Sequence, residues 1–365
     1  MNAGPSAQRA STIGIDVWPM RPNPTGIGVY VTELAAALSE LAPRRTVPLG
    51  RSYQSQRRGG LPMSRLHLGW VLAHADADAR RAGCDLVHYT NAVAPLRARV
   101  PFVVTIHDLS ILRMPAHHPR RRLASVPFML AAARRARQVI VPSIATSEEV
   151  RRLLHVAADR ISVVPLAARP LSEHRPGDST LADFGLRAGD YVLALGTIEP
   201  RKNHARLLTA FERIVTTHAD LRLVIAGHRG WRDGPFWRAL RRSPVRDRVI
   251  VTGRQSDAAI GALLGSCAVL AYPSVYEGFG LPIIEGMAAG APVVTSRTSS
   301  MIEVAGGAAV LVDPFDPESI ADGMLDALRR RDELAAAGLA RVAGRSWLDV
   351  ARETLSVYDR ALAAT

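Results

Sequence analysis

Short apolar runs alternate with longer amphipathic stretches along the whole chain, and this alternation is typical of parallel α/β layering. The apolar runs of the first half predict strands at residues 12–17, 86–88, 102–106, 138–141 and 161–164. Those of the second half predict strands at residues 191–195, 221–226, 249–251, 269–272, 292–295 and 309–312. Neither half repeats with a period of about 20–50 residues, which argues against a solenoid.

Amphipathic patterns between these strands predict helices at residues 29–41, 203–217 and 257–264. A further helical stripe of apolar residues runs from Trp347 to Leu362. Thr146 and Glu149 have the spacing of a capping box and predict a helix that opens there. Residues 165–185 are rich in Pro, Ser, Gly and charged side chains, so we interpret them as a linker between two domains.

The segment Glu277-Gly-Phe-Gly-Leu-Pro-Ile-Ile-Glu285 combines a glycine-containing loop with the start of a predicted helix. Glu277 precedes the helix N-terminus, and Glu285 lies about one turn inside the helix. The apolar face of this helix is predicted to hold Ile283, Ile284, Met287 and Ala288. The free N–H groups and positive dipole end between the two carboxylates suit a phosphate. Sugar and ribose hydroxyls donate to carboxylates, so the pattern favours a nucleotide-sugar site.

Each glutamate also has a structural interpretation. Glu277 alone could be a solvated loop residue, and Glu285 alone could be a first-turn acid stabilised by the helix dipole. For either residue by itself that interpretation is preferred. The pair, placed around Gly278-Phe279-Gly280, favours a functional role.

Composition places the chain among globular proteins, with 48% hydrophobic and 22% charged residues over 365 positions. This length suits two domains, each with its own core. Residues 1–11 lack the apolar core of a signal peptide, and the most apolar run, 263–275, is too short to span a bilayer. Cys84 and Cys267 are isolated, which indicates neither a disulfide framework nor a metal site. A cytoplasmic enzyme with buried cysteines is expected.

The formal net charge of +13 comes largely from arginine clusters. These are Arg57-Arg58, Arg80-Arg81, Arg120–Arg122, Arg134-Arg135 with Arg137, Arg151-Arg152 and Arg241-Arg242. Two interpretations have equal weight: peripheral binding to an anionic membrane at the inner face of the cell membrane, or a general preference for Arg on solvated surfaces. Nucleic acid is disfavoured, because aromatic residues make up only 5% of the chain and no recognition motif accompanies the arginines.

The Glu277–Glu285 segment resembles the hallmark of the retaining glycosyltransferases of the GT-B fold, in particular glycosyltransferase family 4. Other stretches resemble family landmarks in the family's order: residues 196–203, 223–227, 251–253 and 310–314. The resemblance covers the C-terminal half strongly and the N-terminal half more loosely. It implies an α/β GT-B fold, with two Rossmann-like domains facing each other across a cleft. The expected divisions are an acceptor-binding domain at 1–170, a nucleotide-sugar-binding domain at 171–345, and a helix at 346–365 that crosses back to the first domain.

Arg201 and Lys202 follow the strand at 191–195, at the end of a parallel strand where ligands collect. Two adjacent cations there could neutralise a diphosphate leaving group, as magnesium does elsewhere. The surrounding Gly196-Thr-Ile-Glu-Pro-Arg-Lys-Asn203 matches the family's diphosphate clamp, which also brings Gly196 into the nucleotide-sugar site. No Asp-x-Asp metal signature occurs in the sequence, so no metal and no cofactor are expected.

His107 and Asp108 follow the strand at 102–106 and could be a structural pair or half of a base–orienter arrangement. The resemblance implies that His107 lies near the donor sugar. Gly26-Ile-Gly28 sits between a predicted strand and helix, but Val31 occupies the third Rossmann glycine position, so a nicotinamide site is poorly supported. A tight turn explains this motif alone; the resemblance places Gly26 and Gly28 near the diphosphate and the acceptor.

The remaining expected site residues come from the same resemblance. Arg254, or the backbone beside it, is implied in recognition of the nucleotide base. Gly278, Phe279, Gly280 and Leu281 would line the nucleotide-sugar site, with Glu277 on the sugar hydroxyls and Glu285 on the ribose hydroxyls. His117-His118 lies among prolines and arginines and is interpreted as a loop, not a metal site.

The expected activity is metal-independent transfer of a hexose from a nucleoside-diphosphate sugar to a glycan or lipid-linked acceptor, as in polysaccharide biosynthesis, with retention at the anomeric carbon. The opening Gly14-Ile-Asp-Val-Trp-Pro19 and the 196–203 stretch look most like bacterial mannosyltransferases that use GDP-mannose. Two alternatives stay open: a nucleotide-sugar epimerase or hydrolase of the same fold, and a non-enzymatic sugar-binding protein. The sequence leaves the oligomeric state open.

Overall fold

The computed structural model describes residues 11–20, 26–43, 45–50, 63–171 and 180–364. Most of the predicted linker is described, but its central residues 172–179 lie outside these ranges, as do Thr25 and the Arg57-Arg58 cluster.

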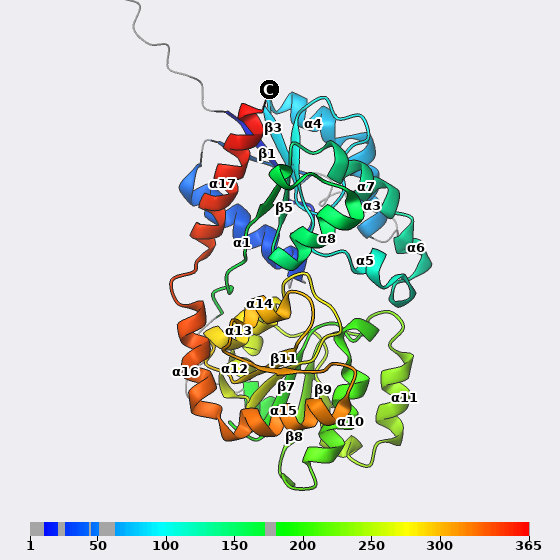
Figure 1. The fold of residues 1–365 in the computed structure, drawn as a ribbon, viewed down its shortest axis with the longest axis vertical. Helices are drawn as coiled ribbons and strands as arrows, with labels where there is room; N and C mark the ends of the chain where they lie inside the picture. The colour runs from blue at the N-terminus through cyan, green and yellow to red at the C-terminus, as the bar shows by residue number, and fades with distance from the viewer. Residues whose placement is uncertain (1–10, 21–25, 44, 51–62, 172–179, 365) are drawn as a thin grey trace, which may run out of the picture.

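Two parallel six-stranded sheets form the framework of the chain (Figure 1). The first has the order β2-β1-β3-β4-β5-β6. Its strands are β1 (Ile13–Asp16), β2 (Thr46–Leu49), β3 (Leu86–Tyr89), β4 (Phe102–Thr105), β5 (Gln138–Val141) and β6 (Ile161–Val163). Their pairings are all parallel. Four of these strands, β1, β3, β4 and β5, are buried throughout, which explains why their sequences are mostly apolar.

The second sheet has the order β12-β11-β10-β7-β8-β9, again with parallel pairings. Its strands are β7 (Tyr191–Leu195), β8 (Arg222–Ala226), β9 (Val249–Val251), β10 (Val269–Tyr272), β11 (Val293–Ser296) and β12 (Val310–Val312). The predicted α/β class and all eleven predicted strands are confirmed. Strand β2 was not predicted: Pro48 interrupts its short apolar run, and such a proline is tolerated because β2 lies at the sheet edge.

Helices connect the strands of the first sheet. They are α1 (Gly26–Leu41), α3 (Met63–Ala73), α4 (Ala75–Arg81), α5 (Ser110–Arg113), α6 (Arg120–Leu123), α7 (Val126–Arg135) and α8 (Ile144–Leu154). The predicted capping box is wrong, because α8 opens earlier: the Ser143 side chain accepts from the Thr146 N–H at 3.0 Å. Gly26 and Gly28 lie in the first turn of α1 rather than in a turn before it, so the expected helix start at Val29 is also wrong.

The second half contains the remaining α-helices. They are α9 (Thr180–Asp183), α10 (His204–Ile214), α11 (Gly234–Arg242), α12 (Asp257–Ser266), α13 (Leu281–Ala288), α14 (Met301–Ala305), α15 (Pro317–Arg329), α16 (Arg331–Val342) and α17 (Trp347–Ala363). Pro282 occupies the first turn of α13 as predicted. Three of the four apolar-face residues predicted for α13 are buried, whereas Ala288 is exposed. Among the described residues, the helices are all too short or too polar to cross a bilayer.

The last helix returns to the first sheet, although it follows the second sheet in sequence. Figure 1 shows α17, in red, running beside α1, in blue. Tyr358 on α17 hydrogen-bonds to His88 on β3 at 2.7 Å, and Asp359 pairs with Arg45 at 2.9 Å. Arg137 donates to the carbonyl of Ala361 at 2.8 Å. The expected domain divisions at 170 and 345 stay predictions.

Candidate functional site

The loop between β10 and α13 lies at the point where the two halves of the chain meet. A side-chain Cβ on Gly278 would lie 1.7 Å from the carbonyl oxygen of His107, so only glycine permits this close approach. Gly280 ends the loop with φ of 101°, a conformation that also favours glycine. The loop therefore joins the carboxyl end of β10 in one sheet to the segment after β4 in the other.

Hydroxyl groups from both halves hold this loop in place. Ser143 and Thr146 from the first half donate to the carbonyl of Gly278 at 2.7 and 3.0 Å. Ser300 from the second half donates to the carbonyls of Glu277 and Phe279 at 2.9 and 3.1 Å. The backbone around Glu277 is therefore held by hydrogen bonds from both halves of the chain.

Glu277 is buried and shared between two cations. Its carboxylate accepts from Arg201 Nη1 at 2.5 Å and from Lys202 Nζ at 2.7 Å. The Tyr272 hydroxyl donates to the same carboxylate at 2.9 Å. Burial opposes ionisation, but the charges of Arg201 and Lys202 outweigh it and lower the pKa of Glu277 to about 2.

Arg201 and Lys202 lie at the end of the turn that follows β7, as predicted. Arg201 also pairs with Glu199 at 2.9 Å and donates to the carbonyl of Tyr276 at 2.8 Å. Burial alone would lower the pKa of Arg201, but Glu277 and Glu199 raise it well above its usual range. Lys202 also hydrogen-bonds to the Tyr272 hydroxyl, and burial lowers its pKa. Two cations and two carboxylates thus form one buried, charge-balanced cluster.

Lys202 is the only lysine of the chain, although lysine and arginine together number 46. Its ammonium group is more compact than the guanidinium that the chain carries at its other Lys/Arg positions. The space beside the Tyr272 hydroxyl and Glu277 suits this smaller group.

Glu285 has a different partner from Glu277. It is buried on α13, where the Nε atom of Arg169 lies 2.7 Å from its carboxylate. Burial raises the pKa of Glu285, and Arg169 counteracts this only in part. The structure thus brings Glu277 together with Arg201 and Lys202, and pairs Glu285 with a cation that sequence reasoning missed.

His107 lies directly after β4, with its backbone against Gly278. Its Nε2 atom lies 2.8 Å from the carbonyl oxygen of Thr90, which can only accept, so Nε2 carries the proton. Burial lowers the pKa of His107, which favours the neutral ring with a lone pair on Nδ1. Asp108 instead accepts from the Ser110 N–H and hydroxyl at 2.9 and 2.7 Å.

Other expected site residues lie in different places: Gly196 is beside Lys202, and Gly26 is beside the start of α13. Gly26 faces α13, since a Cβ there would lie 3.9 Å from Leu281 Cδ1. A Cβ on Gly196 would lie 3.4 Å from Lys202 Cε. Phe279 is buried in the loop itself. Arg254 is exposed on the segment after β9, at the edge of the second sheet.

Two tyrosines of the site were not predicted, although both lie beside the Glu277 motif. Tyr272 ends β10 and bonds to Glu277 and Lys202. The Tyr276 hydroxyl accepts from the Leu109 N–H at 3.1 Å and donates to Glu149 on α8. Three of these four bonds join residues at least 70 positions apart, so no local pattern in the sequence signals them.

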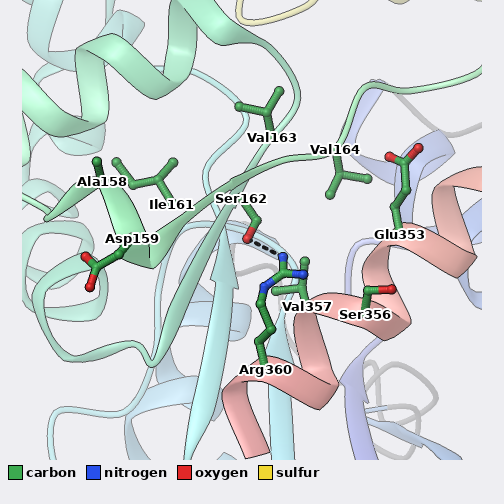
Figure 2. A pocket seen from close by; sticks show the side chains of 10 residues that line it. All are labelled: Ala158, Asp159, Ile161, Ser162, Val163, Val164, Glu353, Ser356, Val357 and Arg360. Atoms are coloured by element: carbon green, nitrogen blue, oxygen red, sulfur yellow. Dashed lines mark hydrogen bonds between the residues drawn. The ribbon is translucent and has the colours of Figure 1, made fainter. Parts of the chain in front are cut away.

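A separate pocket of about 350 Å³ lies at the outer edge of the first sheet, between β6 and α17 (Figure 2). Arg360 on α17 reaches across it and donates to the Ser162 hydroxyl at 2.9 Å. Its lining contains none of the expected site residues.

Two family models match the chain, one in each half. Residues 187–339 match the glycosyl transferases group 1, and residues 24–168 match glycosyltransferase family 4. The O-antigen chain mannosyltransferase B of Escherichia coli is 33% identical over 266 residues, covering 70% of this chain and 69% of that protein. The MMP alpha-(1->4)-mannosyltransferase of Mycolicibacterium hassiacum is 29% identical over 309 residues, covering 78% and 72%.

Solved structures share the architecture at lower identity. The sucrose-phosphate synthase of Thermosynechococcus elongatus superposes with a TM-score of 0.74 at 21% identity, over 98% of this chain and 100% of that one. Anabaena HepE, in complex with UDP and glucose, gives 0.73 at 18% identity, over 96% and 99%. These similarities confirm the expected GT-B fold.

The lowered pKa of Glu277 predicts a loss of stability in acid. A carboxylate with a folded-state pKa of about 2, against an ordinary value of 4.5, contributes stability that is complete above pH 4.5 and lost as the pH falls toward 2. The contribution is about 3 kcal/mol at most. Denaturant unfolding at pH 5, 4 and 3 should show this decline in the natural protein and a flatter profile in Glu277→Gln. Glu40→Gln, at an exposed acid on α1, is the control; equal pH slopes in all three proteins would contradict the assignment.

Proposed function

Because the chain belongs to the group 1 glycosyl transferases of glycosyltransferase family 4, we propose that it transfers a mannosyl group from GDP-mannose to a glycan or lipid-linked acceptor. The observation that carries this proposal is the buried cluster of Arg201, Lys202 and Glu277 beside the N-terminus of α13. It places two cations that can donate to a diphosphate beside a carboxylate that can accept from sugar hydroxyls.

Arg201, Lys202 and the N–H groups at the start of α13 would stabilise the charge that develops on the departing diphosphate. Preorganised donors in a site that excludes water make this electrostatic contribution the largest in catalysis. The two cations supply the charge that a metal ion supplies in other transferases, so the proposed reaction is metal-independent.

Glu277 and His107 would position the donor sugar. An ionised Glu277 can accept hydrogen bonds from two sugar hydroxyls while its cations hold it in place. The Nδ1 lone pair of neutral His107 can accept from a third hydroxyl. Glu285 would accept from the ribose hydroxyls.

The proposed transfer retains the configuration of the anomeric carbon. The acceptor hydroxyl attacks this carbon from the face of the leaving group, the bond to the phosphate oxygen breaks, and the proton passes to the departing phosphate. Closure of the cleft would exclude water and so limit hydrolysis of the donor.

The preference for mannose rests on similarity to two mannosyltransferases, one from Escherichia coli and one from Mycolicibacterium hassiacum. A thermal-shift panel of GDP, UDP and ADP with their sugars tests the donor. The largest stabilisation should come from GDP-mannose, and a larger one from a uridine compound would contradict this choice.

Mass spectrometry after incubation with donor alone separates transfer from epimerisation or hydrolysis. A protein that binds the sugar without any turnover would instead fit a non-enzymatic binding protein.

Lys202→Ala should lower turnover by roughly 10²–10³-fold, the scale of losing one stabilising donor. Lys202→Arg should also be impaired, because the larger, planar guanidinium cannot reproduce the point contacts that the Lys202 ammonium makes with Tyr272 and Glu277. Turnover with donor and acceptor is the measurement. Arg206→Lys, which makes the reverse exchange four residues along the chain on α10, is the control. Full activity of Lys202→Ala would remove Lys202 from the diphosphate clamp.

Glu285→Ala should weaken binding of the bare nucleoside diphosphate, because the ribose hydroxyls lose their acceptor. The loss should be about tenfold or more, the scale of a hydrogen bond to a charged group. Calorimetry with GDP measures it, and Glu318→Ala, at an exposed acid in the first turn of α15, is the control. Unchanged affinity for GDP would exclude the ribose role.

The exposed arginines of α6 suit an acceptor embedded in an anionic membrane. Each basic residue near such a surface contributes about 1 kcal/mol. Changing Arg120–Arg122 to serine should therefore reduce co-sedimentation with anionic liposomes at low salt. The same change at Arg241-Arg242, on α11 of the second half, is the control. Equal sedimentation of both variants and the natural protein would favour the compositional explanation.

A further inference from the structure

Arg169 connects the segment after β6 to the second half of the chain. Its Nε atom lies 2.7 Å from the Glu285 carboxylate on α13, and its Nη1 atom lies 2.5 Å from Asp257 at the start of α12. The Arg169 side chain is only 12% exposed. A residue placed before the predicted domain division thus reaches the carboxylate that is proposed to bind ribose.

The charges around Arg169 are unbalanced. Three carboxylates act on one another and on this guanidinium: Glu285 on α13, Asp257 on α12 and Glu33 on α1. Glu285 is 4% exposed, whereas the Asp257 side chain is 54% exposed and can be stabilised by water. Arg169 is therefore the cation on which the buried Glu285 depends.

Loss of a partner has a specific consequence for a buried carboxylate. An uncompensated buried charge is costly, and the group binds a proton instead. Burial raises the pKa of Glu285, Arg169 lowers it, and Asp257 and Glu33 raise it again. Without Arg169, the nearby charges would all favour protonation of Glu285.

Ionisation of Glu285 matters for the proposed binding of ribose. An ionised carboxylate offers two acceptor oxygens, which match the two hydroxyl donors of a ribose. A protonated acid places its own hydrogen on one of these oxygens and forms weaker bonds.

We propose that Arg169 is a positioning residue for the nucleotide: it keeps Glu285 ionised and oriented, so that the ribose hydroxyls meet a charged acceptor. This inference rests on the proposed ribose role of Glu285. Arg169 lies on the segment that follows β6, so this segment takes part in nucleotide binding through Glu285.

The test is calorimetry of GDP binding between pH 6 and 9 with the natural protein, Arg169→Gln and Arg169→Lys. Arg169→Gln should weaken binding about tenfold or more at pH 7, the scale of losing a hydrogen bond to a charged group, because the uncompensated Glu285 then binds a proton. Its affinity should recover as the pH rises toward 9 and Glu285 ionises. Arg169→Lys keeps the charge and should retain most of the affinity at pH 7.

A double variant assigns the pH dependence to its source. In Arg169→Gln with Glu285→Gln, the titrating carboxyl is gone, so the weak binding should no longer recover at high pH. Removing both partners also avoids a lone buried charge, which protects the fold if Arg169→Gln alone is unstable. Arg345→Gln is a matched control, since Arg345 pairs with Glu353 and bonds to the carbonyl of Pro165 near the same segment; its affinity for GDP should not change.

Several outcomes would overturn the inference. Unchanged affinity of Arg169→Gln would show that Glu285 does not depend on Arg169. Tighter binding would mean that Arg169 occupies the ribose position and must be displaced. A loss that is equal at pH 6 and pH 9 would indicate a structural role only. If Glu285→Ala itself binds GDP normally, the proposed function of Glu285 fails instead, which separates the two claims.

Discussion

Glu277 lies buried between Arg201 and Lys202 at the place where the two halves of the chain touch. Each group would be costly to bury alone, and together they balance one another. Their positions depend on the loop around Gly278, which passes so close to the His107 carbonyl that a side chain is excluded. The ion cluster and the contact between the halves are therefore parts of one arrangement.

The same contact is reinforced along the start of α8. Glu303 on α14 accepts from the backbone N–H groups of Ile144 and Ala145 at 2.9 and 3.1 Å. Ser143 and Thr146 add their bonds to Gly278. Carboxylates suit the positive end of a helix, so a group from the second half completes a helix of the first. Such contacts would set the spacing between donor and acceptor in the proposed transferase.

The fold was largely predictable because buried parallel strands have continuous apolar sequences. The positions of Arg201 with Lys202 and of Glu277 were predictable because each lies in a recognisable local motif, although the two motifs are far apart in sequence. Partners that come from distant segments were not: Arg169 lies more than 100 positions from Glu285, and nothing nearby marks it. Two helix starts were predicted too late. Thr146 and Glu149 also have the spacing of a capping box, although α8 begins at Ile144. The Gly26-Ile-Gly28 motif is also compatible with a turn before the helix, although α1 begins at Gly26. Whether the predicted site residues bind the nucleotide sugar stays a prediction.

Because the chain contains a single lysine, its side chain can be observed by itself. NMR of protein labelled with ¹⁵N-lysine should give one side-chain ammonium signal, from Lys202. Addition of GDP should shift this signal in step with binding measured by calorimetry, because the diphosphate would lie against Nζ. An unchanged Lys202 signal in protein that is saturated with GDP would contradict the central claim that this buried cluster binds the diphosphate.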